Sequence, residues 1–346
     1  MILTLILTVL GLIAVADASA PQALSTFNDK FYFVKQQIIW GGLGLVLLFI
    51  VSKIHYLLWE KIALPVFLLS ILGLLLVIIP SVGSQILGAR RWINVGPISI
   101  QPSEFVKLAL AIYLAKVFSK GKGALSYFLP MGLVLVLIMF QPDLGTALVV
   151  GGTAMTQIFV SGISIFYFLG ALLIGILASF VLIITSTYRR DRLMTFLEQT
   201  HDPLGKSYHI RQVLLALGSG GLFGVGLGAS RQKYLFLPEA ATDSIFAVVA
   251  EEVGFIGALI ILFLFVAFII RGLKIANNAP DKFSQLLATG IVAWIGVQIF
   301  LNIGSMVALT PLTGVPLPFF SYGGSALTMV LVAAGILLNI SKHGKS

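Results

Sequence analysis

The fold is decided by the stretch Leu237-Pro-Glu-Ala-Ala-Thr-Asp-Ser-Ile-Phe-Ala-Val-Val-Ala-Glu-Glu-Val-Gly254, in which a polar segment turns directly into an apolar one. The apolar run continues to Ile270, so it is long enough to cross a bilayer, which takes about 20 apolar residues in a helix. Asp243 stands where this span opens. Carboxylates next to an apolar span are costly and usually functional, which makes Asp243 the first candidate site residue.

The composition of the chain is that of an integral membrane protein. Of its 346 residues, 58% are hydrophobic and only 10% are charged, whereas about a quarter of the residues in an ordinary soluble domain are charged. Cysteine is absent, which excludes disulfides, thiol nucleophiles and Cys-based metal sites. The net charge of +9 fits an anionic lipid surface or an anionic substrate, and no nucleic-acid motif accompanies it.

Ten apolar segments predict an all-α integral membrane protein, a polytopic bundle of about ten transmembrane helices that fills residues 1–346 as one domain. The segments cover residues 1–16, 36–52, 62–79, 102–118, 127–140, 144–160, 165–185, 243–270, 283–307 and about 325–340. No Lys or Arg precedes the first segment, which favours a span over a signal peptide. One long connection, about residues 186–242, joins spans seven and eight, and its pattern over Tyr208 to Leu217 predicts a surface helix.

The number of membrane crossings places the candidate residues at one face of the membrane. Because each pair of crossings returns the chain to the same side, spans four, six, eight and ten all begin at the face that carries the long connection. Lys and Arg in the short loops of the other face weigh most in the positive-inside rule. We therefore expect a multi-pass membrane protein with both termini cytoplasmic and the long loop outside.

Asp243 can act in two ways. It can cap the following helix, since an acid near a helix N-terminus satisfies free N–H groups and suits the helix dipole. It can also be a general base, whose ionised form a helix N-terminus favours. At about 100° per residue, Glu251 lies some 80° from Asp243 around the helix, whereas Glu252 lies on the opposite side. Glu251 is expected to line the same cavity or to lock helices together, and Glu252 to pair with another helix.

Three more charged residues open spans on this face. Glu104 and Lys107 follow Pro102, and Asp143 follows Pro142. Each can be a capping or ion-paired residue, or it can line a cavity in which Lys107 contacts an anion.

Arginines on the same face indicate a phosphate-rich ligand, because guanidinium groups match phosphate oxygens. The candidates for binding such phosphate groups are Arg90, Arg91, Arg211 and Arg231. For Arg189, Arg190 and Arg192 we favour anchoring to lipid headgroups, because they follow directly on a span end.

Five stretches, in order along nearly the whole chain, resemble motifs of the SEDS family (shape, elongation, division and sporulation). They are Gly88-Ala-Arg-Arg-Trp-Ile-Asn94, Gln101-Pro-Ser-Glu-Phe-Val-Lys107, Gln141-Pro-Asp-Leu-Gly-Thr146, Leu237–Asp243 with Ala250-Glu-Glu-Val-Gly254, and Pro318-Phe-Phe-Ser-Tyr-Gly-Gly-Ser325. Each motif alone is weak, but five in register are specific. Within the family, Thr313–Gly324 is more similar to division members than to elongation members.

The resemblance implies a peptidoglycan glycosyltransferase that polymerises lipid II, an undecaprenyl-diphosphate-linked disaccharide peptide, at the outer face of the bacterial cytoplasmic membrane. It also implies a class B penicillin-binding transpeptidase and other division or elongation membrane proteins as partners. The essential aspartate of the family falls on Asp243, and its characteristic cavity residues fall on Glu104, Lys107 and Asp143. The motif residues Glu239 and Ser321 are expected to line the same cavity.

Two positions depart from the family pattern. Ala241 stands where many members have His, and Ser244 stands where many have Phe. The first change removes a hydrogen-bonding partner for the neighbouring carboxylates, and neither change touches Asp243.

In the implied reaction, Asp243 accepts the proton of the 4-hydroxyl group of an acceptor sugar. The oxygen of this hydroxyl attacks the anomeric carbon of the donor, with inversion. The charge of the departing polyprenyl diphosphate then needs arginine, lysine or a divalent cation such as Mg²⁺ or Mn²⁺, and the sequence leaves the metal open. One alternative is a flippase for the same lipid, which needs polar groups at both faces. A non-catalytic division scaffold is another, but it leaves the one-sided acids without a role.

Overall fold

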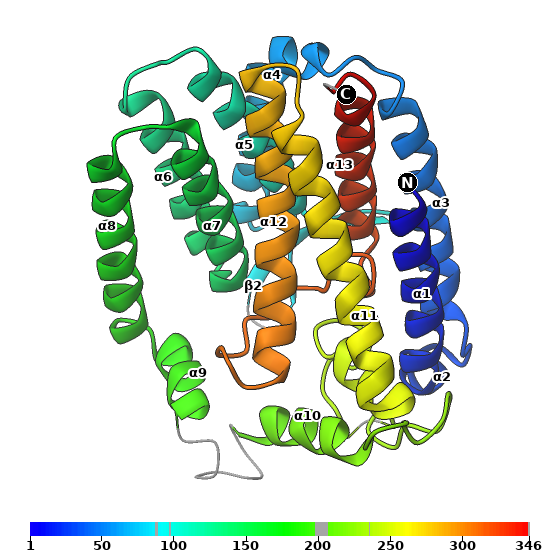
Figure 1. The fold of residues 1–346 in the computed structure, drawn as a ribbon. Helices are drawn as coiled ribbons and strands as arrows, with labels where there is room; N and C mark the ends of the chain where they lie inside the picture. The colour runs from blue at the N-terminus through cyan, green and yellow to red at the C-terminus, as the bar shows by residue number, and fades with distance from the viewer. Residues whose placement is uncertain (87–88, 97, 198–206, 235, 345–346) are drawn as a thin grey trace.

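The computed structural model of the chain describes residues 1–86, 89–96, 98–197, 207–234 and 236–344. Its long helices run roughly side by side (Figure 1), and each of the ten predicted spans overlaps one of them. They are α1 (Ile2–Ala18), α3 (Tyr32–Val51), α4 (Leu57–Ile78), α5 (Pro102–Ser119), α6 (Leu125–Phe140), α7 (Leu144–Ser161), α8 (Ile165–Ile184), α11 (Ile245–Asn277), α12 (Lys282–Met306) and α13 (Gly324–Lys342).

The all-α membrane fold is confirmed. In the described part of the chain, seven helices are long and apolar enough to cross a membrane, and α1 forms an eighth candidate with α2 (Ala20–Phe27) across a 52° bend. The remaining two are less apolar or shorter: α5 carries Glu104, Lys107 and Lys116, and α6 has 16 residues. The protein is therefore a multi-pass helical membrane protein.

The core of the bundle is built around α5, α12 and α13, whose side chains are mostly buried. Trp294 on α12 is fully buried. A helix that is apolar on all sides can be covered completely by neighbours. By contrast, α8 has no buried residue and stands at the edge of the bundle (Figure 1), so most of its apolar surface is free to face lipid.

A small antiparallel sheet lies in the segment between α4 and α5, and the sequence did not predict it. It has the order β1 (Gly83–Ile86), β2 (Ala89–Val95) and β3 (Ile98–Ile100). Its short strands pair Ser84 with Trp92 and Asn94 with Ser99. Gly88, the first residue of the Gly88–Asn94 motif, lies outside the described residues.

The described part of the long connection contains two helices, α9 (Thr187–Leu197) and α10 (Tyr208–Ser219). The predicted helical pattern from Tyr208 is thereby confirmed. Both helices lie at the lower end of the bundle in Figure 1. Helices α7, α11 and α13 begin in the lower half of the bundle and run upward from there. We call this the α10 end of the bundle.

Helix α11 is broken at Gly254, which has φ 71° and ψ −175°. The carbonyls of Glu251 and Glu252 accept hydrogen bonds from the N–H groups of Val225 and Gly226, at 3.0 and 3.1 Å. On the other side of the break, the N–H groups of residues 255 and 256 donate to the carbonyls of residues 221 and 222, at 2.9 and 3.2 Å. The loop therefore satisfies backbone groups that the break frees, as buried backbone requires.

Candidate active site

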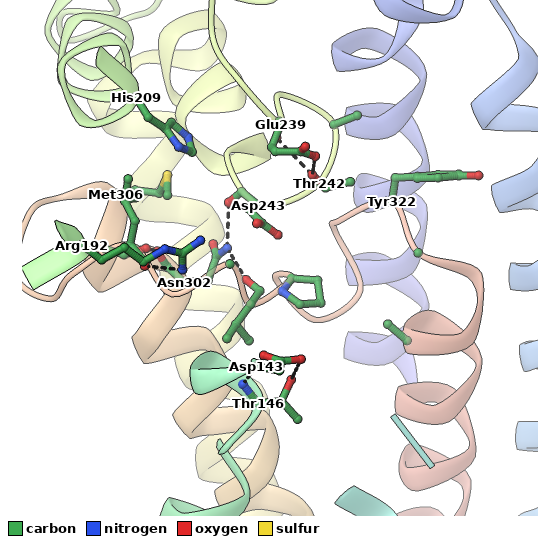
Figure 2. Close-up of a pocket in the computed structure, with 18 of the residues that line it drawn as sticks. Asp143, Thr146, Arg192, His209, Glu239, Thr242, Asp243, Asn302, Met306 and Tyr322 are labelled. Carbon is green, nitrogen blue, oxygen red and sulfur yellow. Dashed lines mark hydrogen bonds between the residues drawn. The ribbon is translucent and has the colours of Figure 1, made fainter. Parts of the chain in front are cut away.

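A cavity of about 760 Å³ opens at the α10 end, between the starts of α7, α11 and α13, the end of α12 and the helices α9 and α10. Figure 2 shows side chains from these elements converging on it. Its lining includes the polar and aromatic residues Phe33, Arg91, Gln101, Asp143, Arg192, His209, Glu239, Asp243, Asn302 and Tyr322.

Three hydrogen bonds hold the backbone around Asp243. The carbonyls of residues 241, 242 and 243 accept from the backbone N–H of Tyr322 at 2.9 Å, the hydroxyl of Ser321 at 2.6 Å and the side-chain amide of Asn302 at 2.8 Å. The loop before α13 and the end of α12 therefore fix the position of Asp243 from two sides.

The carboxylate of Asp243 is available for chemistry. Among the described residues no group hydrogen bonds to it, and the N-cap position of α11 is held by Ser244, which makes no side-chain capping bond, so the capping interpretation of Asp243 is wrong. Burial raises the pKa of Asp243 to about 7; Glu239 and Asp143 also raise it, and Arg192 and Arg91 oppose them. The expectation that the helix N-terminus keeps Asp243 ionised is thus corrected, because loss of hydration outweighs it. A pKa near neutrality is what a general base requires.

Arg192 lines the cavity next to Asp243, which corrects its interpretation as a lipid anchor. Its Nη1 donates to the carbonyl of Leu312 at 2.9 Å. The gap between the two charged groups is marked by Gly314: a Cβ added there would lie 3.3 Å from Asp243 Oδ2 and 3.8 Å from Arg192 Nη1. The sequence did not show which of the three clustered arginines lines the cavity. Helix α9 places Arg192 there.

Arg91 and Asp143 line a deeper part of the cavity. Arg91 donates from Nε to the carbonyl of Gln141 at 3.1 Å and from Nη2 to that of Pro142, and its Nε lies 4.0 Å from Asp143 Oδ2. Asp143 accepts from the backbone N–H of Thr146 at 3.0 Å and from its hydroxyl at 2.8 Å. Asp143 is thus both a helix cap and a cavity residue.

The other arginine candidates lie elsewhere. Arg90 precedes Arg91 on β2, where successive side chains point to opposite faces, and it is not in the cavity lining. Arg211 on α10 and Arg231 are exposed and also lie outside it. Of the four diphosphate candidates, the structure brings only Arg91 to Asp243.

Glu104 and Lys107 do not line the cavity, which corrects that expectation. They form a buried ion pair of 2.8 Å, and Lys107 Nζ also donates to Gln298 Oε1 at 2.9 Å and lies over the ring of Trp294. A charge this deep needs such partners. Gln298 in turn donates to the carbonyl of Pro316 at 2.8 Å, so the pair supports a loop that lines the cavity.

Ser321 and Glu251 also support the site from outside the cavity. Ser321 was expected to line the cavity, but its hydroxyl is buried against Thr242 instead. Glu251 is buried as well, and it accepts hydrogen bonds from the hydroxyls of Ser219 and Ser230. Of its two interpretations the structural one holds: Glu251 fastens the loop after α10 to α11.

Glu252 forms a buried ion pair, but its partner Lys233 lies in a turn of the long connection and not on another helix as predicted; the link to helix α1 runs through Lys233. Lys233 Nζ lies 2.8 Å from Glu252 Oε1 and 2.7 Å from Asp17 Oδ1 on α1. Lys233 and Glu252 are both 4% exposed, so this ion cluster joins α1, the long connection and α11 in a site of low dielectric.

His209 is a cavity residue that the sequence did not indicate. Its Nε2 lies 2.7 Å from the hydroxyl of Ser244, the position where many SEDS members have Phe. Burial lowers the pKa of His209 to about 4. The imidazole is therefore neutral at pH 7, and it hydrogen bonds the residue next to Asp243.

Metal ligation was left open by the sequence. Among the residues that the structure describes, no group of three or more His, Asp or Glu side chains could hold an ion together. A divalent cation at Asp243 would therefore take further oxygen ligands from a bound diphosphate, as Mg²⁺ commonly does.

Comparison with known proteins assigns the family. The family model for "Cell cycle protein" (FtsW, RodA and SpoVE) matches residues 1–346. Stage V sporulation protein E of Bacillus subtilis is 45% identical, and the alignment covers 99% of this chain and 96% of the relative. The probable peptidoglycan glycosyltransferase FtsW of Geobacter metallireducens is 39% identical, with 100% and 94% covered.

Solved structures agree with this assignment. A chain from a peptidoglycan synthase complex that coordinates polymerization and crosslinking has a TM-score of 0.78 at 29% identity, covering 99% of this chain and 96% of that one. The rod shape determining protein RodA of Thermus thermophilus has a TM-score of 0.72 at 29% identity, covering 100% and 96%. The resemblance found in the motifs is thus confirmed, and the chain belongs to the SEDS family of FtsW, RodA and SpoVE proteins.

Proposed function

We propose that this chain is a peptidoglycan glycosyltransferase that polymerises lipid II at the outer face of the cytoplasmic membrane, with Asp243 as the general base. One observation carries the proposal: the Asp243 carboxylate stands in a cavity with no hydrogen-bonding partner among the described residues, and its pKa is about 7. The name of the Geobacter relative supports the same reaction class.

In the proposed step, an oxygen of Asp243 takes the proton of the acceptor 4-hydroxyl. The hydroxyl oxygen forms a bond to the anomeric carbon of the donor sugar, and the bond from that carbon to the polyprenyl diphosphate breaks. The diphosphate leaves with the electron pair. Because one base activates one nucleophile and no protein group attacks the carbon, the anomeric configuration inverts.

We assign to Arg192 and Arg91 the stabilisation of the charge that develops on the departing diphosphate. Both guanidinium groups are close enough to Asp243 to lower its pKa, and fixed cations stabilise a charge that forms in the transition state. Lys107 takes no part in this role, since Glu104 and Gln298 hold its ammonium group inside the bundle.

The placement in the membrane follows from the same site. We assign the α10 end to the outside and both termini to the cytoplasm, so that the polyprenyl chain stays in the bilayer while its diphosphate reaches the cavity. We also assign the chain a class B penicillin-binding transpeptidase as a partner, because a similar chain belongs to a complex that couples polymerization and crosslinking. Its relatives include a sporulation protein and a probable peptidoglycan glycosyltransferase.

The flippase alternative is less well supported. A transporter needs polar groups toward both faces, but the polar cavity lies at the α10 end. A second cavity of about 600 Å³ between α1, α11 and α13 is lined mainly by apolar side chains, with Arg271 and Lys274 as its charged residues.

The deciding experiment is Asp243→Asn in the purified full-length chain, assayed by polymerisation of lipid II. We expect a loss of about 100-fold or more with an unchanged melting temperature. Asp29→Asn, which affects an exposed pair with Lys35, is the control and should keep the parent rate. A folded Asp243→Asn protein that polymerises as fast as the parent would refute the assignment.

A further inference from the structure

The cavity has an aromatic side that the proposed chemistry does not use. Phe33 on α3 and Tyr322 in the loop before α13 both line it, and their rings meet edge to face with centroids 4.9 Å apart. We call this pair the aromatic wall. Figure 2 shows Tyr322 on one side of Asp243 and Arg192 on the other. Asp243 therefore lies between Tyr322, whose ring extends away from the carboxylate, and the cationic Arg192.

The lining residues on the α13 side of the aromatic wall are uncharged. The lining continues through Gly323 and Ala326 at the start of α13 and includes the carboxamides of Gln22 and Gln101. The backbone N–H of Gln101 donates to the Ser325 hydroxyl at 3.4 Å, which places Gln101 next to this part of α13. Carboxamides donate and accept hydrogen bonds, as hydroxyl-rich ligands require.

The aromatic wall is held at a fixed distance from the base. The backbone N–H of Tyr322 donates to the carbonyl of Ala241, two residues before Asp243. On the other side, the buried amide of Gln37 donates to the carbonyl of Ser321 and accepts from the N–H of Gly323, both at 3.1 Å. Tyr322 is therefore clamped between α3 and the Asp243 loop, so a ligand on its ring meets Asp243 in a defined geometry.

The chemistry of the two sides separates two parts of the substrate. The face of an aromatic ring is negative, so it does not suit a diphosphate. A sugar ring presents a face of C–H groups, which packs on an aromatic ring, and an edge of hydroxyls for the carboxamides. We propose that the aromatic wall is the subsite for the acceptor sugar, which it holds with the 4-hydroxyl at Asp243. The assignment rests on the proposed glycosyltransferase function and names where one substrate binds.

The rival explanation is an interfacial belt, in which aromatic side chains anchor the protein at the membrane surface. The chain offers a matched control for it. Tyr32 stacks on Phe27 with centroids 3.8 Å apart, and it packs against Phe33 in the same aromatic cluster, but it does not line the cavity. An anchoring role would make Tyr32 and Tyr322 equivalent, whereas a sugar subsite would make only Tyr322 important.

The test compares the full-length parent with Tyr322→Leu, Tyr322→Phe, Phe33→Leu and Tyr32→Leu in detergent. Binding of the free disaccharide N-acetylglucosaminyl-N-acetylmuramic acid is measured by saturation-transfer NMR, independently of turnover, and lipid II polymerisation is measured on the same samples. We expect Tyr322→Leu and Phe33→Leu to weaken disaccharide binding about five- to tenfold, the loss of a ring contact. Tyr322→Phe, which keeps the ring, and Tyr32→Leu should bind like the parent.

Two results would overturn the subsite: equal weakening by Tyr32→Leu and Tyr322→Leu, or disaccharide binding by Tyr322→Leu that equals the parent's. If Tyr322→Leu does not fold, the comparison of Phe33→Leu with Tyr32→Leu decides whether the aromatic wall binds the sugar. If the parent binds the disaccharide at the aromatic wall but does not polymerise lipid II, the proposed function fails while the sugar subsite stands.

Discussion

Asn302 on α12 donates a hydrogen bond of 2.8 Å from its side-chain amide to the main-chain carbonyl of Asp243. The same amide nitrogen donates to the carbonyl of Val315, also at 2.8 Å. Asn302 is 1% exposed, so one buried side chain ties the backbone of the base to the loop that passes Gly314. The position of the carboxylate thus depends on a residue that need not touch substrate.

Replacing Asn302 by Leu should therefore impair catalysis as well as stability. The two carbonyls lose their donor, and an unsatisfied buried polar group costs about 1–3 kcal/mol. We expect kcat to fall at least about tenfold, the cost of misplacing a catalytic group. Asn339 is the control, because it is equally buried and donates to the carbonyl of Ser52 near the opposite end of the bundle. Asn339→Leu should lower the melting temperature but leave kcat unchanged; equal losses of kcat would contradict the positioning role.

The polymerisation rate should rise with pH through about 7. A general base works in its ionised form, and burial raises the pKa of Asp243 to about 7, so activity is low below that pH and level above it. His209 stays neutral in this range because its pKa is about 4. A profile of kcat/KM between about pH 5 and 9 should show a single ascending midpoint.

Two substitutions should move that midpoint in opposite directions. Arg192 lowers the pKa of Asp243 and Glu239 raises it. Arg192→Gln should therefore shift the midpoint to higher pH, and Glu239→Gln should shift it to lower pH. A profile that stays in place in both variants would show that another group is titrating.

Gly314→Ala should block the cavity. Gly314 has φ +69°, and the added methyl would lie 3.3 Å from Asp243 Oδ2, in the space that a substrate hydroxyl must reach. Gly162, at the end of α7, is the matched control: it has φ +81° but no atom within 4 Å of an added Cβ. Both variants carry the backbone strain of about 1–2 kcal/mol, measurable by thermal unfolding. Only Gly314→Ala should lose lipid II polymerisation, and equal activity in the two variants would contradict this account.

Lys233→Met should destabilise the protein severely. It leaves the Glu252 carboxylate buried without its cation, and breaking a buried pair costs about 3–5 kcal/mol. Lys35→Met, which breaks an exposed pair with Asp29, should leave the melting temperature unchanged. Similar melting temperatures for the two variants would show that the Asp17, Lys233 and Glu252 cluster is not structural.

The sequence predicted the helices well because hydropathy alone decides them. The run from Leu144 and the run from Lys282 must each cross a bilayer, and no distant contact is needed to see it. The small sheet was missed because short strands among Gly, Ser and Pro residues carry no clear periodicity. Its strand β2 nevertheless brings Arg91 into the cavity.

The candidate site was harder to predict, because burial does not follow from position along a helix. Glu104 and Asp143 both follow a proline at a span start, yet Glu104 is closed off by Lys107 while Asp143 faces the cavity. The helical angle of Glu251 was calculated as if Asp243 lay on the same helix, but α11 begins only at Ile245. The end of α10 and the loop after it cover that side of α11 and supply the serines that Glu251 binds.

The break in α11 divides the helix mechanically. An unbroken helix would couple Asp243 to the half of its own span that lies away from the α10 end. Here the hydrogen bonds to residues 221–226 make the first turns of α11 part of the long connection instead. A force applied to that connection, such as the pull of a bound partner, is transmitted to the base directly, while the remainder of α11 can stay packed in the bundle.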